Sequence, residues 1–274
     1  MGKIIEPVLA ESFESIIENI ETHLDKFKKD AIIVFRGLKF SRQQQVALTR
    51  RFGDEIGWYP NSSSWPAAFW SYEENHSHTM DRYDKHDVPK DELFLSWHLE
   101  HMGHKNPAIG ATWNMEKFTC DHGVGNTLFV NISDIYDMFN KEETDFLKKC
   151  KVAAVIGQEE PVLHDAVELY EPSGRFSLRL NALFKYDRET FYLHSYDGRE
   201  PSIDESDRFM NLSLRFTDNV HKNEDIQQVH MWQENDLVVV DLFLMVHAVL
   251  GGFKPSERFF HGCWARRQDF SKHQ

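Results

Sequence analysis

From Leu93 onward the chain is a succession of short, apolar, β-prone runs, and this pattern limits the fold more than any other feature of the sequence. Helical patterns interrupt the runs near residues 133–150 and 202–219. Many short strands at irregular spacing, with helices beside them, predict a mainly β protein with flanking helices (an α+β arrangement), built on a β-sandwich or a barrel. The runs that begin at Leu93 are LFLSWHLE, AIGATWNM, NTLFVNI, KVAAVIG, RFSLRLNAL, DLVVVDLF and ERFFHGCWA.

The first 60 or so residues form a separate helix-and-strand elaboration. Residues 11–29 place apolar side chains on one helical face, which predicts an amphipathic helix. The run AIIVFRG then predicts a strand, and SRQQQVALTRRFGD predicts a second helix with Ser41 as its N-cap and Gly53 as its C-cap.

Residues 54–92 are polar and contain three prolines, so we expect a long, lid-like loop. His76 and His78 lie in it, but no apolar alternation surrounds them, and we interpret them as loop histidines rather than as a metal pair. No linker interrupts the sequence, which predicts a single domain over residues 1–274.

Charge and cysteine content exclude several classes of protein. A formal net charge of −13 repels phosphate backbones, so nucleic acid is not an expected partner. Cys120, Cys150 and Cys263 are odd in number and widely spaced, which predicts free thiols in a reducing compartment, by default the cytoplasm.

Membrane association is not expected either. The N-terminus turns acidic before any apolar stretch accumulates, so no signal peptide is predicted. The longest apolar run, from Leu237 to Phe253, contains Asp241 and His247 and is too short to span a bilayer. We expect a small-molecule substrate, and a homo-oligomer remains open.

The segment LFLSWHLEHMGH concentrates three histidines and a glutamate. Its apolar residues alternate with period two, and glycine and proline follow too soon for a helix. On a strand, His98 and Glu100 project from the same face and form a candidate pair of metal ligands. His101 and His104 would then lie at the strand end or in the turn and are not expected to bind the metal.

A His-x-Glu pair arises by chance in a chain with 15 histidines and 44 acidic residues, so other residues must support it. His247 ends the apolar run 238–246, and Arg258 opens a second apolar run eleven positions later. A buried arginine needs an anionic partner, for which a carboxylate has the matching geometry. Two histidines and a carboxylate are the ligands of the facial triad of non-heme Fe(II) oxygenases, in which the arginine would bind the far carboxylate of 2-oxoglutarate.

On these residues the sequence resembles the taurine dioxygenase superfamily of Fe(II)/2-oxoglutarate-dependent oxygenases, from about the first helix to the final strand. WHLE stands at the family's His-x-Asp/Glu position, and GNTLFV at 125–130 is similar to its Gly-Asp-Thr-Leu stretch. The resemblance implies a double-stranded β-helix (jelly roll) that uses Fe(II), 2-oxoglutarate as co-substrate, and O₂. It also implies that His98, Glu100 and His247 are the catalytic metal ligands and that Arg258 and Thr127 bind 2-oxoglutarate.

The resemblance further implies a hydroxylase of an unactivated C–H bond that releases succinate and CO₂. Glutamate replaces the more usual aspartate at position 100, as in clavaminate synthase and similar amino-acid hydroxylases, so a free amino acid or similar zwitterion is the first expectation for the substrate. The arginine with which taurine dioxygenase anchors a sulfonate corresponds to Gly262, so taurine itself is not the expected substrate. A small sulfonate or phosphonate is the second expectation. A carboxylate at position 100 argues against halogenation.

Two other classes of function stay open from the sequence. One is a catalytically silent jelly-roll sensor that binds a metal or a small acid, and the other is a zinc hydrolase that uses the same three ligands. Trp113 and Asn114 are candidates to line the pocket, although core packing also explains the tryptophan. Arg175 and Arg179 either contact an anionic substrate or face solvent, and Thr127 has the alternative of being an ordinary strand residue.

Overall fold

The computed structural model describes residues 2–56, 58–59, 77–79, 88–100, 102–103, 107–156, 160–184 and 190–267. Most of the predicted lid at 54–92 lies outside these residues, as do His76, His101 and His104 and the side chain of His78. The prediction of a single domain over residues 1–274 stays a prediction.

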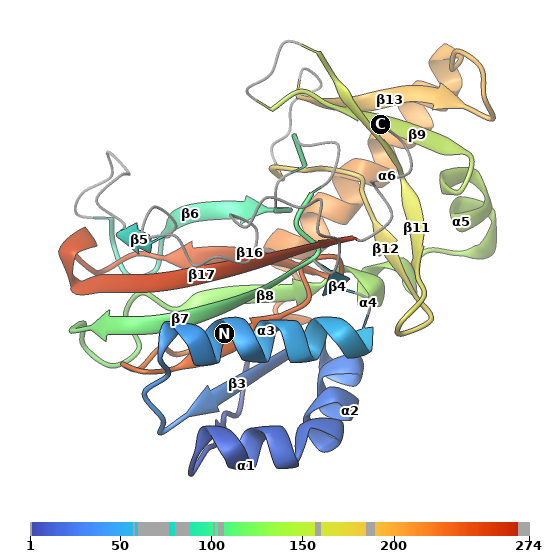
Figure 1. Cartoon of the computed structure of the whole chain (residues 1–274). Helices are drawn as coiled ribbons and strands as arrows, with labels where there is room; N and C mark the ends of the chain where they lie inside the picture. The colour runs from blue at the N-terminus through green and yellow to red at the C-terminus, as the bar shows by residue number, and fades with distance from the viewer. Residues whose placement is uncertain are drawn as a thin grey trace.

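Two large sheets organise the molecule (Figure 1). The first has the strand order β1 (Lys3–Ile4), β14 (Gln227–His230), β8 (Thr127–Asn131), β16 (Met245–Leu250) and β6 (Leu93–His98). The second has the order β2 (Val8–Leu9), β3 (Ile32–Arg36), β15 (Leu237–Val240), β7 (Gly110–Phe118), β17 (Arg258–Arg267) and β4 (Trp58–Tyr59), and β5 (Ser77–Thr79) also pairs with β17. Smaller pairings join β10 (Val162–Asp165), β9 (Cys150–Ala154) and β13 (Phe191–Tyr196), and β11 (Val167–Tyr170) with β12 (Arg175–Leu178).

The inner faces of the two large sheets pack against each other. The ring of Trp113 on β7 lies 4.9 Å from that of His247 on β16, and 6.1 Å from that of Phe129 on β8. Val246 and Ala248 alternate with His247 and belong to the hydrophobic cluster behind the first sheet. This alternation turns His247 toward the space between the sheets. The mainly β, jelly-roll fold expected from the sequence is confirmed.

Helices cover the outer faces of the sheets. Figure 1 shows α1 (Phe13–Glu18), α2 (Ile20–Asp30) and α3 (Arg42–Ile56) together beside β3 and β7. The apolar side chains Ile16, Leu24 and Phe27 of the predicted amphipathic helix are buried there. The hydrophobic cluster behind the first sheet includes residues of α4 (Ile132–Tyr136), α5 (Lys141–Leu147) and α6 (Ile203–Lys222). A short 3₁₀ turn at Pro255–Glu257 precedes β17.

Two details of the predicted N-terminal helices differ from the structure. The helix expected over residues 11–29 is divided at Asn19 into α1 and α2. Ser41 does cap α3, since its Oγ accepts from the Gln44 N–H at 3.2 Å. Gly53 does not end that helix, because α3 continues to Ile56 with Gly53 buried against the core.

The apolar run from Leu237 to Leu250 is divided between two strands. Residues 241–244 leave β15 and enter β16, which belongs to the other sheet. Asp241 organises the crossing, because its buried carboxylate accepts the N–H groups of Phe243 at 3.0 Å and Leu244 at 3.1 Å. The crossing moves the chain from the second sheet to the first. His247 on β16 therefore lies on the sheet opposite the one that contains β17.

The three cysteines are free thiols, as the sequence predicted. Within the described residues, the helices are too short or too polar to cross a membrane.

Candidate active site

His98, Glu100 and His247 come together between the sheets, with candidate ligand atoms all within 4.8 Å of one another. The Glu100 Oε2 atom lies 3.7 Å from His98 Nε2 and 3.6 Å from His247 Nε2. Pairing of β6 with β16 places the two histidines opposite each other, with ring centroids 4.1 Å apart. All three side chains are mostly buried, so a bound cation would be largely shielded from water.

Glu100 reaches this cluster differently from the sequence prediction. β6 ends at His98, and Glu100 lies in the turn that follows rather than on the strand. The Leu99 N–H donates to the Ala182 carbonyl at 2.8 Å, and the buried Leu99 side chain holds the turn against the core. The turn brings the carboxylate back beside His98.

The His98 ring is oriented for metal binding through Nε2. Its Nδ1 atom lies 2.8 Å from the Ser96 carbonyl oxygen, and because a carbonyl can only accept, Nδ1 is the protonated nitrogen. The lone pair of the neutral ring is then on Nε2, beside Glu100. In the metal-free protein, burial lowers the pKa of His98, but the neighbouring Glu100 carboxylate outweighs it and the pKa is raised.

The donor set fits a divalent metal. Two imidazole nitrogens and one carboxylate oxygen on one side of a shared position match the facial triad of non-heme Fe(II) enzymes, and the same set also accepts zinc.

Arg258 and Thr127 meet at one end of this space. The Arg258 guanidinium is buried, and its Nη2 donates to Thr127 Oγ1 at 3.0 Å. Trp232 Nε1, which sequence reasoning did not single out, donates to the same oxygen at 2.8 Å. β17 and β8 therefore bring a cation and a hydroxyl together between the sheets.

The other residues considered from the sequence have partners within the fold. Trp113 packs on His247 at the back of the cluster, whereas the Asn114 amide donates to the Phe40 carbonyl on the outer side. Arg175 bonds Ser133 and Asp134 of α4. Arg179 is buried, 3.4 Å from Glu168 and over the Phe243 ring, and does not face solvent.

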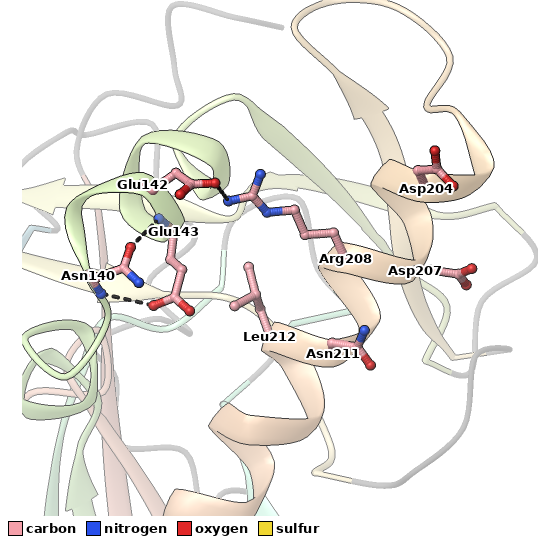
Figure 2. A pocket seen from close by; sticks show the side chains of 8 residues that line it. All are labelled: Asn140, Glu142, Glu143, Asp204, Asp207, Arg208, Asn211 and Leu212. Atoms are coloured by element: carbon pink, nitrogen blue, oxygen red, sulfur yellow. Dashed lines mark hydrogen bonds and ion pairs between the residues drawn. The ribbon is translucent and has the colours of Figure 1, made fainter.

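A surface hollow of about 420 Å³ between α5 and α6 is separate from this site (Figure 2). Arg208 bonds Glu142 across it at 2.9 Å, and Glu143 and Asn140 bond each other in a helix cap. The predicted site residues do not line the hollow.

Comparison with known proteins agrees with the geometry. The family model "Taurine catabolism dioxygenase TauD, TfdA family" matches residues 9–264. No curated protein sequence matches the chain at a significant level.

Solved structures share the fold at low sequence identity. A taurine dioxygenase from Burkholderia xenovorans superposes with a TM-score of 0.63 and 14% identity, covering 97% of this chain and 90% of that one. AAD-2, solved in complex with Mn(II) and N-oxalylglycine, superposes with a TM-score of 0.58 and 17% identity, covering 97% and 91%. Because the family model spans nearly the whole sequence, the chain belongs to the TauD/TfdA family and is an Fe(II)- and 2-oxoglutarate-dependent dioxygenase.

Proposed function

We propose that His98, Glu100 and His247 bind Fe(II) and that Arg258 and Thr127 bind the distal carboxylate of 2-oxoglutarate. The observation that carries the first part is the convergence of the three ligand atoms within 4.8 Å. The second part is supported by a buried guanidinium beside a hydroxyl, which suits a carboxylate and poorly suits an apolar ligand.

With iron and 2-oxoglutarate bound, O₂ is activated and the co-substrate is converted to succinate and CO₂ while a C–H bond is oxidised. The protein's own residues bind and orient the reactants. Arg258 fixes one end of the co-substrate, and Trp113, Phe129 and Phe260 exclude water from the space beside His247.

The proposed outcome is hydroxylation of an unactivated C–H bond in a small polar molecule, first a free amino acid or similar zwitterion. A small sulfonate or phosphonate is the second candidate. The first is supported by Glu100, the carboxylate that the amino-acid hydroxylases resembling this chain also use. Gly262 speaks against taurine: a cationic side chain is missing at the position that corresponds to the sulfonate anchor, and the Trp264 indole lies where such a side chain would start.

Anaerobic titration of the metal-free protein with Fe(II) and 2-oxoglutarate tests the site. We expect the weak visible charge-transfer band of an iron–oxoglutarate chelate in the wild type and its loss in His247→Ala. The matched control is His194→Ala, which removes an exposed histidine outside the cluster and should keep the band. A folded wild-type protein with no band would overturn the proposal.

Two further measurements separate the other classes of function. A silent sensor would bind metal or 2-oxoglutarate but release no succinate, either with amino acids or by uncoupled turnover. A zinc hydrolase would act without O₂ or 2-oxoglutarate. Succinate release that requires both, together with a hydroxylated amino acid in the product mixture, would support the proposal.

A further inference from the structure

Trp232 lies in the loop between β14 and β15, behind the Arg258–Thr127 pair. Its side chain is 3% exposed, and its ring centre is 5.4 Å from the Arg258 guanidinium carbon. The indole Nε1–H donates to Thr127 Oγ1 at 2.8 Å, and Arg258 Nη2 donates to the same oxygen at 3.0 Å. Two donors thus converge on one hydroxyl oxygen.

The hydrogen-bond capacity of the Thr127 hydroxyl fixes where its own proton can go. A hydroxyl oxygen has two lone pairs and one hydrogen, whereas the indole and guanidinium N–H groups can only donate. Trp232 and Arg258 therefore occupy both lone pairs. The proton must be donated elsewhere, and the described residues offer it no acceptor within hydrogen-bond distance. A buried donor of this kind requires an acceptor, which a bound ligand can supply.

A buried polar network also holds the indole in place. The ring of His230 packs edge-on against Trp232 at 4.4 Å, and His230 Nε2 lies 3.2 Å from Asp236 Oδ2. Arg36 binds both oxygens of Asp236 at 2.7 Å each, and Asp236 is fully buried. Because each group is fixed by the next, Trp232 has little freedom to turn its N–H away from Thr127.

We propose that Trp232 is a positioning residue for the co-substrate: it occupies one lone pair of Thr127 so that the hydroxyl proton and the Arg258 guanidinium both face the same carboxylate. The inference rests on the proposed function of Arg258 and Thr127. It adds to that site Trp232, from the loop between β14 and β15. It also assigns Thr127 the role of hydrogen-bond donor to the ligand.

Calorimetric titration of the Mn(II)-loaded protein with N-oxalylglycine tests this role apart from turnover. Trp232→Phe keeps an aromatic ring, although a smaller one, and removes the N–H, so we expect the Kd for N-oxalylglycine to rise roughly three- to ten-fold with unchanged Mn(II) affinity. Thr127→Val should weaken binding at least as much, and Thr127→Ser should bind nearly as the wild type does. If Trp232 acts through Thr127, the double variant Trp232→Phe/Thr127→Val binds no more weakly than Thr127→Val alone.

The matched control is Tyr136→Phe, which removes the hydroxyl of a half-buried aromatic residue on α4, stacked on Phe176 outside the site, and should leave N-oxalylglycine binding unchanged. A wild-type Kd retained by Trp232→Phe, or additive effects in the double variant, would overturn the role of Trp232 alone. A wild-type protein that binds Mn(II) but not N-oxalylglycine would instead overturn the proposed co-substrate site.

Nuclear magnetic resonance supplies a test that does not depend on the folding of Trp232→Phe. In the ¹⁵N-tryptophan-labelled, Zn(II)-loaded protein, we expect one indole signal to move when Thr127→Val removes its acceptor. The same signal should move when N-oxalylglycine binds the wild type. If no indole signal responds to both changes, the hydrogen-bond linkage is wrong.

Discussion

Gly262 shows how a single residue shapes the wall of the site. A methyl group at this position would lie 2.2 Å from Cη2 and 2.4 Å from Cζ3 of Trp264. The indole therefore occupies space that any larger residue would need. Gly262 is paired with Trp113 across β17 and β7, so this part of the wall is aromatic.

We expect Gly262→Ala to lower the free energy of unfolding by about 1–3 kcal/mol, because the added carbon overpacks a filled space. Urea denaturation measures the change. Trp264→Leu as a second substitution should recover part of the loss, and Trp264→Leu alone is the control. Additive losses in the double variant would show that the two side chains do not compete for the same space.

The candidate residues found from the sequence are those whose chemistry is tied to a local pattern. His98 and Glu100 are two apart and His247 adjoins an apolar run, and the structure brings these three together. Their role as metal ligands stays a prediction. Trp232 could not be expected, because VHMWQEND has no pattern that distinguishes a core tryptophan from one that bonds Thr127, 105 residues away. Its role depends on tertiary contacts alone.

Among the elements, the crossing from β15 to β16 has the most direct effect on the site. A continuous apolar run reads as a single strand, since periodicity does not register a change of sheet. The only sign in the sequence is Asp241, a charge within that run, which accepts two backbone N–H groups at the crossing. Other short strands, such as β14 and β10, carry mixed polar patterns and could not be separated from loops.

Asp241→Ala should destabilise the protein by about 1–3 kcal/mol, because the Leu244 N–H loses its acceptor in a buried turn and the Phe243 N–H keeps only the Ile109 carbonyl. Asp241→Asn keeps an acceptor oxygen in the same place and should cost much less. Burial raises the pKa of Asp241 to about 7, so a neutral side chain is already accepted there. Chemical denaturation at pH 7 compares the two variants. Equal losses would mean that the turn does not depend on this acceptor.

At the scale of the whole molecule, stability should fall in acid partly through His164 on β10. Burial, with a smaller effect from Arg179, lowers the pKa of His164 to about 4, and its Nε2–H donates to the Met102 carbonyl at 2.9 Å. The folded pKa lies below the unfolded value, so between about pH 6.5 and pH 4 only the unfolded chain binds the proton.

The contribution of His164 to this loss is about 1–2 kcal/mol at pH 5 relative to pH 7. In His164→Gln, the unfolding free energy should depend less steeply on pH over this window. Urea unfolding at pH 5, 6 and 7 measures the slope, and His194→Gln, which changes an exposed histidine, serves as the control. An unchanged slope in His164→Gln would assign the acid sensitivity to other groups.

The meeting of Arg258 from β17 with Thr127 from β8 has a mechanical consequence, because these strands belong to opposite sheets. The proposed co-substrate binds both residues through one carboxylate, and its other end binds a metal held by β6 and β16. Such a molecule would link the two sheets of the jelly roll. Ligand binding would then stabilise the protein against separation of the sheets. The free energy of unfolding would increase with the logarithm of the ligand concentration. The concentration of 2-oxoglutarate would thus set how stable the folded protein is as well as how fast it works.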